Sequence, residues 1–330
     1  MTAPAFIPHP LLPNRHLMTL VPYYWPRWLR PRETPTEARQ FMVAPESQIL
    51  GSCHWQPARD RHATVILVHG LEGSSDSHYM VGIARKAYRA GFNAVRLNQR
   101  NCGGTDHLTP TLYNGGLSAD LREVVTALSA ADGIEAIWLV GYSLGGNLVL
   151  KMAGEVGSTL PALKGVVAVS PSIDPAACVE ALERPSNWIY HRSFVAHLRA
   201  RIRRKARLFP GRFDLSPLDA VRTLRQFDET YTAPDGGYAS AADYYERSGA
   251  RHVLGAIKVP TLIITAQDDP CVPYRQFETS ILHGNPRIRL AAPTHGGHCG
   301  FLQRPRAAED VFWAENRLVD FITAHQARRW

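Results

Sequence analysis

The sequence predicts an α/β protein with a mostly parallel central sheet that helices cover on both faces. Short runs rich in β-branched residues alternate with amphipathic helical patterns three times before residue 143, and this order favours parallel strands joined by crossover helices. The alternation fails between about residues 175 and 255, where aromatic pairs and a basic run predict a mainly helical insertion. We therefore expect a core formed by residues 41–174 and 256–330, a helical lid over 175–255, and an extended N-terminal arm over 1–40.

Length and composition place few limits on the core but several on the cellular setting. The chain has 330 residues, of which 45% are hydrophobic, so a substantial core is feasible. It contains no uninterrupted apolar run of about 18 residues, and its first residues lack the charged-then-apolar pattern of a signal peptide. The five cysteines are odd in number and scattered, which argues against a disulfide framework and a zinc cage. These features predict a cytoplasmic protein.

The formal net charge of +8 raises the question of a polyanionic partner. No helix-turn-helix, RNP or zinc-finger signature accompanies the charge, so we expect no nucleic-acid partner. Much of the excess lies between Arg199 and Arg207 and at the C-terminal Arg328-Arg329. The run from 199 to 207 fits a solvated helix face better than a patch that binds anionic lipid or an acidic substrate.

The first 40 residues are rich in proline and aromatic residues, which excludes a long helix or a central strand. An extended arm packed over the domain fits this composition, and a surface that touches lipid is the alternative. We therefore expect at most peripheral membrane contact. From Gln40 to Trp55 the alternation of apolar residues predicts an antiparallel hairpin at a sheet edge.

The run Ala63–Val68 predicts a strand that is buried on both faces and ends in the glycine-containing loop His69–Ser75. Glycines at such a point let backbone N–H groups approach a ligand, so the N–H of Leu71 is a candidate oxyanion donor. Taken alone, a plain tight turn would explain the loop. We expect His69 to orient this loop as a hydrogen-bond donor. A helix over 79–88, a strand over 92–98 and a helix around 121–128 follow.

The centre of the chain is a strand, a sharp turn and a helix around Ser143. The apolar run 134–140 stops at Gly141, and helical spacing resumes at Leu148 after Gly145. In Gly-x-Ser-x-Gly the small residues let strand and helix approach closely, and the strained turn raises the serine hydroxyl above the sheet. Ser143 is therefore the candidate nucleophile, and the N–H of Leu144 at the start of the helix is a candidate oxyanion donor.

Two later strands supply acidic and basic partners for this serine. A strand over 259–266 runs into Asp268 and Asp269, and a strand over 288–292 leads to a loop with His295 and His298, before a closing helix. A serine hydroxyl needs a general base that an acid holds in place, and carboxyl ends of parallel strands meet at one sheet edge. Ser143, Asp269 and His298 follow one another in the chain order Ser, Asp, His that an α/β-hydrolase arrangement demands, with each residue at the end of a strand.

Both partners have a neighbour of the same type. We favour Asp269 as the acid because it lies four residues before Pro273 in a turn shaped like an acid loop, and Asp268 is then a turn or lid residue. His298 is favoured as the base because glycines flank it, and His295 is then a structural neighbour. The His-x-x-His spacing has no third ligand in its loop, so we expect no metal and no cofactor.

Several motifs together resemble the YheT-like branch of the α/β-hydrolase superfamily. They are Asn14-Arg15-His16-Leu17, His69-Gly70-Leu71-Glu72-Gly73, Arg100-Asn101-Cys102-Gly103-Gly104, Gly141-Tyr142-Ser143-Leu144-Gly145-Gly146-Asn147, Ala266-Gln267-Asp268-Asp269-Pro270, Gly297-His298-Cys299-Gly300-Phe301, and the lid segment from Phe227 to Tyr245. The resemblance covers almost the whole chain. Asn101 stands where the family commonly has glycine, and Met18 where it has glutamine. The resemblance implies a carboxylesterase or lipase-like hydrolase.

The sequence predicts a serine hydrolase that cleaves carboxylic esters through an acyl-enzyme, with Ser143, Asp269 and His298 as the triad and the N–H groups of Leu71 and Leu144 as the oxyanion hole. An acyltransferase or thioesterase that uses the same triad is the alternative, because lid shape and water access choose the acceptor. A binding protein on the same fold is a further alternative. The expected partner is a small-molecule ester or a lipid-like substrate.

Overall fold

The computed structural model describes residues 4–25, 36–307 and 309–327. Its sheet contains, in spatial order, β1 (Glu37–Ala44), β2 (Ser47–His54), β4 (Asn93–Asn98), β3 (Thr64–Val68), β5 (Ile137–Tyr142), β6 (Leu163–Val169), β7 (Thr261–Ile264) and β8 (Ile288–Ala291). The pairs β1–β2 and β2–β4 are antiparallel, and the strands from β4 to β8 run parallel. The predicted α/β fold class and the antiparallel edge hairpin are confirmed.

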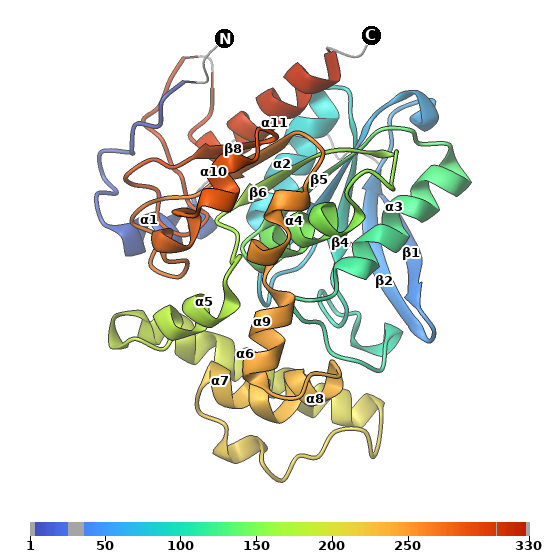
Figure 1. Ribbon diagram of the computed structural model, residues 1–330, viewed down its shortest axis with the longest axis vertical. Helices are drawn as coiled ribbons and strands as arrows, with labels where there is room; N and C mark the ends of the chain where they lie inside the picture. Colours follow the sequence, from blue (N-terminus) through green and yellow to red (C-terminus); the bar gives the residue numbers. More distant parts are fainter. Residues whose placement is uncertain (1–3, 26–35, 308, 328–330) are drawn as a thin grey trace.

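Two helical layers bury the two faces of this sheet (Figure 1). Successive side chains of a strand point to opposite faces. In β3, Val65 and Leu67 belong to the apolar cluster that includes α2 (His78–Arg89) and α11 (Trp313–Gln326). Ile66 and Val68 belong to the other cluster, with α3 (Ser118–Asp132) and α4 (Leu144–Val156). A strand that is covered on both sides needs the continuous apolar run that the sequence has there.

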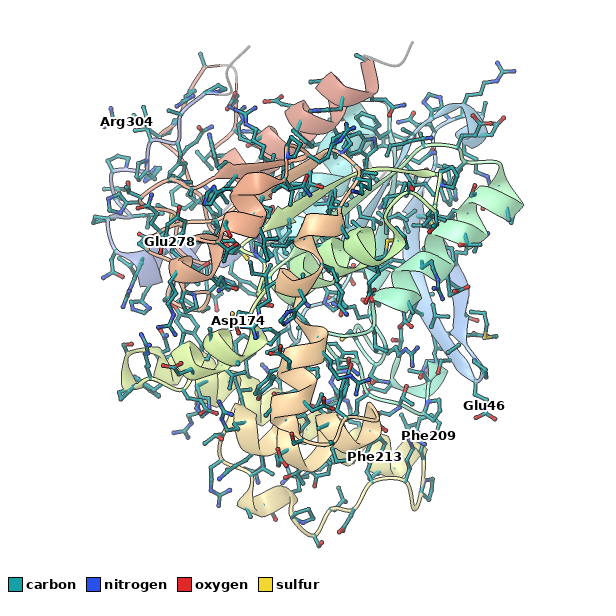
Figure 2. All side chains as sticks on the ribbon, in the orientation of Figure 1. Glu46, Asp174, Phe209, Phe213, Glu278 and Arg304 are labelled. Carbon is teal, nitrogen blue, oxygen red and sulfur yellow. The ribbon has the colours of Figure 1, made fainter. Side chains whose placement is uncertain are left out.

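The segment between β6 and β7 is helical, as its sequence predicts. It contains α5 (Pro175–Leu182), α6 (Trp188–Leu208), α7 (Leu224–Phe227), α8 (Ala233–Asp235) and α9 (Ala241–Ser248), which gather at the end of the molecule that is lowest in Figure 1. Asp174 caps α5 at the junction with the core, and Phe209 and Phe213 follow the far end of α6 (Figure 2). The short helix α10 (Ser280–Gly284) precedes β8.

The N-terminal segment differs from the expected extended arm, because residues Arg15–Tyr24 form the helix α1. The side chain of Asn14 caps it by accepting hydrogen bonds from the backbone N–H groups of His16 and Leu17. Pro22 is tolerated near the C-terminal end, and β1 begins at Glu37. The proline-rich stretch 26–35 lies outside the described residues. In the described part of the chain, no helix combines the length and apolar composition needed to cross a lipid bilayer.

The basic run in α6 is not a uniformly solvated face. Arg201 is 3% exposed and Lys205 is fully buried, on the same side as the apolar residues Leu198 and Ile202. The ammonium group of Lys205 donates hydrogen bonds to the backbone carbonyls of Asp106 and Thr109. Because residues three and four apart share one helix face, these two cations anchor α6 on the core while Arg203 stays half-exposed.

Candidate active site

Ser143 lies in the turn between β5 and α4, with φ of 52° and ψ of −116°. A non-glycine residue with this backbone is strained, and the neighbouring glycines make the turn possible. A Cβ on Gly141 would collide with the carbonyl of Gly145, and a Cβ on Gly145 would collide with the carbonyl of Val68. The strain therefore places the serine hydroxyl at the carboxyl edge of the sheet.

His298 connects this hydroxyl to a buried carboxylate. Its Nε2 lies 3.0 Å from Oγ of Ser143, and its Nδ1 lies 2.8 Å from Oδ2 of Asp269. A carboxylate only accepts hydrogen bonds, so Nδ1–H donates to Asp269 and Nε2 is free to accept from the serine. Oδ1 of Asp269 also accepts from the backbone N–H groups of Cys271 and Val272, at 2.8 and 2.9 Å. These bonds fix the carboxylate in position.

Three successive backbone N–H groups hold the loop that carries His298. Gly297 donates to Oδ1 of Asp268 at 3.0 Å, His298 donates to Oγ1 of Thr19 at 2.9 Å, and Cys299 donates to Oγ of Ser170 at 3.2 Å. The three acceptors come from three separate parts of the chain. The position of the imidazole therefore depends on α1 and on the ends of β6 and β7.

The neighbouring residues of the predicted partners have other contacts. Asp268 accepts from Gly297 and lies 3.3 Å from Nδ1 of His295, whose side chain is 59% exposed. Asp269, and not Asp268, contacts His298. The structure thus brings together Ser143, His298 and Asp269, while Asp268 and His295 lie on the outer side of the same loop pair.

The environment of His298 works in two directions on its pKa. Burial lowers the pKa of His298, but the carboxylate of Asp269 raises it, and the net pKa lies well above 6.5. Only the neutral ring can accept a proton from Ser143, so this shift sets a lower pH limit on any base function of His298.

The two predicted oxyanion donors lie beside the serine. Leu71 follows β3 and Leu144 is the first residue of α4, and both line the same cavity as Ser143 and His298. The N-terminal end of a helix carries a partial positive charge, which favours an anion at this point. On the other side of the loop, the N–H of Gly70 donates to the hydroxyl of Tyr79 at 3.0 Å.

His69 is fully buried and contacts only protein groups that brace this loop. Its Nδ1 lies 2.8 Å from the carbonyl oxygen of Gly70, to which it donates, and its Nε2 accepts from the N–H of Gln99 at 3.1 Å. Burial lowers the pKa of His69 to about 4. A neutral ring with both nitrogens engaged fits the expected orienting role.

The cavity above Ser143 is mainly apolar and is walled by the helical segment. The core contributes Ser143, His298 and the two leucines. The helices α5, α6 and α7 contribute mostly aliphatic and aromatic side chains, and α6 also contributes Arg201. The apolar wall contains Val179, Leu182, Phe194, Leu198, Leu224 and Phe227. Burial also raises the pKa of the cavity residue Asp228 to about 6, and its carboxylate accepts from the hydroxyl of Tyr245. Such a space suits an acyl chain better than a charged ligand.

Among the described residues, one group of possible metal ligands lies close together, namely Asp269, Cys271 and His298. Two of these three are already hydrogen-bonded to each other. Metal binding requires the thiolate, and burial raises the pKa of the Cys271 thiol to about 12. The donor set therefore fits a hydrogen-bonded pair better than a metal centre.

Three residues that support the site are not among those that the sequence predicts for it: Thr19, Glu72 and the cavity residue Arg201. No local signal distinguishes Thr19 from other threonines. Arg201 had a signal, because it stands at helical spacing from Leu198 and Lys205 on the apolar side of a basic helix.

Residues 63–305 match the model of a family described as alpha/beta hydrolase fold. The chain is 32% identical to "Putative esterase YheT" of Escherichia coli (strain K12), over 97% of this chain and 93% of that protein. It is 29% identical to "Phospholipase ABHD3" of Mus musculus over 73% of this chain, and the match spans 58% of that longer protein. It is 25% identical to "Medium-chain fatty acid ethyl ester synthase/esterase 2" of Saccharomyces cerevisiae, over 78% of this chain and 61% of that one.

Among solved structures, the Pyrococcus furiosus esterase Pf2001 superposes with a TM-score of 0.58 at 14% identity, covering 98% of this chain and 99% of that chain. The 2,6-dihydroxy-pseudo-oxynicotine hydrolase superposes with a TM-score of 0.60 at 19% identity, covering 88% and 69%. At these identities the likeness concerns the fold.

Proposed function

Because this chain belongs to the alpha/beta hydrolase family and is a carboxylic ester hydrolase, we propose that it cleaves esters through an acyl-enzyme formed on Ser143. The observation that carries the proposal is the hydrogen-bond chain from Oγ of Ser143 through His298 to Asp269. A hydroxyl, an imidazole and a buried carboxylate in this order form the arrangement that activates a serine for acyl transfer.

In the proposed reaction, His298 Nε2 takes the proton of Ser143 as Oγ attacks the ester carbonyl carbon. The N–H groups of Leu71 and Leu144 bind the oxyanion that forms, and Asp269 stabilises the imidazolium. The imidazolium then donates its proton to the leaving alkoxide, which departs as an alcohol. Water repeats the sequence: His298 removes its proton, the hydroxyl adds to the acyl carbon, and Ser143 leaves with the proton as the free acid is released.

The apolar cavity supports a carboxylic ester with a short to medium or lipid-like acyl chain as the substrate. Its aliphatic wall between α5 and α7 would bury methylene groups, at about 0.8 kcal/mol for each. One similar protein is named as a phospholipase and another as a medium-chain fatty acid ethyl ester synthase/esterase, and these names support such a substrate.

The cavity also underlies a proposed division of the chain. We propose that residues 41–174 and 256–330 form the catalytic core, that 175–255 act as a lid that supplies the acyl wall, and that the N-terminal 40 residues act as an arm. In support, the cavity is lined by residues from both the core and the helical segment.

Acyl transfer to an alcohol is the second candidate, because the yeast relative is named as both a synthase and an esterase. The same acyl-enzyme would react with an alcohol instead of water. Incubating a nitrophenyl ester with ethanol and quantifying acid and ethyl ester in one reaction separates the two: an ester-dominated product at low ethanol would assign acyl transfer.

The test of the nucleophile combines an activity-based probe with a series of nitrophenyl esters. The parent protein should react with a fluorophosphonate and hydrolyse the esters, with a preference that follows acyl chain length. Ser143→Ala should lose both, while Ser172→Ala, a second cavity serine, should keep both. Probe labelling that survives Ser143→Ala would refute the assignment.

A further inference from the structure

Arg201 is a buried cation in the middle of α6, and it lies in the lining of the cavity above Ser143. Its Nη2 and Nε lie 2.9 and 3.1 Å from the same oxygen, Oε1 of Glu72. Its Nη1 donates to the backbone carbonyl of Asn101, and its guanidinium lies 4.8 Å from the centre of the Tyr113 ring. One side chain of the helical segment thus joins two loops of the core, one after β3 and one after β4.

Glu72 occupies a backbone position that favours glycine. It has φ of 56°, in a tight turn that the Gly73 N–H closes by donating to the Gly70 carbonyl at 3.1 Å. A non-glycine residue in this region is strained by about 1 kcal/mol or more. The glutamate side chain therefore has a role that outweighs this strain, and its contact with Arg201 supplies one.

The turn at Glu72 is fixed by its main chain as well as its side chain. Its N–H donates to the hydroxyl of Tyr113 at 2.9 Å, and that hydroxyl donates to Oε1 of Glu72 at 2.8 Å. Both side chains of the ion pair are less than a tenth exposed. Leu71 directly precedes Glu72, so the conformation of the same turn sets the direction of the Leu71 N–H.

We propose that Arg201 is a positioning residue that holds the Gly70–Gly73 turn in the shape that oxyanion binding requires, so that α6 completes the oxyanion hole from the lid side. The inference rests on the proposed function of the Leu71 N–H. The ion pair couples the helical segment to the core. If α6 moved away from the core, Glu72 would lose its buried counter-charge, and the strained turn would no longer be stabilised.

An arginine suits this role better than a lysine. The planar guanidinium presents several N–H donors in a fixed fork and can reach Glu72 and Asn101 at once, while stacking over Tyr113. An ammonium group is a single strongly hydrated point charge. Arg201→Lys should therefore keep the charge but hold only one of the two loops.

The test measures oxyanion binding directly, with an alkyl trifluoromethyl ketone. Oγ of Ser143 adds to the ketone carbonyl, its proton passes to His298, and the hemiketal oxygen becomes the anion that the N–H groups hold. The variants are Arg201→Met, Arg201→Lys, Glu72→Gln, and the pair Arg201→Gln with Glu72→Gln, which leaves no unpaired buried charge. Arg203→Met is the matched control, since Arg203 is half-exposed on the same helix and pairs with the exposed Asp219.

We expect Arg201→Met to bind the ketone about 10- to 100-fold more weakly. Its kcat/KM for nitrophenyl acetate should fall by a similar factor, mainly through kcat, because a small misplacement of a catalytic group has effects of this size. Arg201→Lys should recover part of the loss, and Arg203→Met should match the parent. The neutral Gln pair should regain thermal stability without regaining ketone affinity, which separates positioning from folding.

Two results would overturn the inference in distinguishable ways. If the fluorophosphonate labels the parent and the Gln pair equally fast and the ketone inhibits both equally, the ion pair only stabilises the fold. If the parent itself is not labelled at Ser143, the proposed function fails and this inference fails with it.

Discussion

The backbone N–H of His298 donates a hydrogen bond to the side-chain oxygen of Thr19, at 2.9 Å, across 279 positions of sequence. The threonine hydroxyl in turn donates to the carbonyl of Arg15, one turn earlier in α1, at 2.7 Å. The hydroxyl is thereby oriented with a lone pair toward the histidine loop. Gly300 lies so close to the same helix that a Cβ there would collide with the carbonyl of Met18.

Replacing Thr19 by valine should slow the enzyme without removing any reacting group. The change keeps the side-chain shape but leaves the His298 N–H unpaired, which costs about 1 kcal/mol and corresponds to about a fivefold loss in kcat/KM. Thr19→Ser keeps the acceptor and should stay near the parent. Steady-state kinetics on nitrophenyl acetate measures both, and equal losses in the two variants would contradict a role for the hydrogen bond.

Single substitutions of the two adjacent aspartates should separate their roles. Asp269→Asn removes the anion that stabilises the imidazolium, so kcat should fall by at least about 100-fold. Asp268→Asn keeps an oxygen that can accept from Gly297, so its loss should stay within about threefold. Single-turnover acylation rates provide the measurement. A larger loss at Asp268 than at Asp269 would reverse the assignment of the acid.

The activity should rise with pH through a pKa above 6.5. The imidazolium form of His298 cannot accept a proton, so kcat/KM should follow the fraction of neutral ring. The raised pKa also stabilises the folded protein below pH 6.5, and this contribution is lost as the pH rises through the folded-state pKa. A pH–rate profile of the parent measures the first effect; a flat profile from pH 5 to 9 would exclude His298 as the base.

Acid should destabilise the fold through His69. Its folded pKa of about 4 lies below its unfolded value of 6.5, so the unfolded chain binds the proton first and stability falls as the pH drops from 6.5 toward 4. A shift of this size corresponds to roughly 3 kcal/mol. The free energy of unfolding in urea should differ less between pH 7.5 and pH 5 for His69→Gln than for the parent. The control variant His295→Gln, at an exposed histidine, should show the same difference in unfolding free energy between the two pH values as the parent.

Local patterns in the sequence were sufficient for the fold and for the residues at the strand ends. β3 and β5 are short apolar runs that end in glycine-containing turns, and their carboxyl ends must meet in a parallel sheet. That rule alone brings residues following β5, β7 and β8 to one edge, whatever their distance along the chain. The turn at Ser143 has an equally local cause.

The contacts that support the site come from long-range packing, which no short pattern records. The prolines of the first 40 residues argue against a long helix, and they do not reveal the short helix α1, which Asn14 caps. The basic run in α6 was interpreted as solvated because charge alone does not show which cations lie on the apolar side. Burial of Arg201 depends on a carboxylate at residue 72, and only the folded chain brings the two together.

The contact of α1 with the His298 loop also sets an order of events during synthesis. Thr19 leaves the ribosome long before the histidine that it supports, and β7 and β8 add their strands to a sheet whose other strands are already made. A nascent chain that already carries Ser143 in its strained turn lacks both hydrogen-bonded partners until residues 269–298 have been made. The hydrogen-bond chain from Ser143 to Asp269 therefore closes only after residue 298 has emerged, when β7 and β8 have joined the sheet.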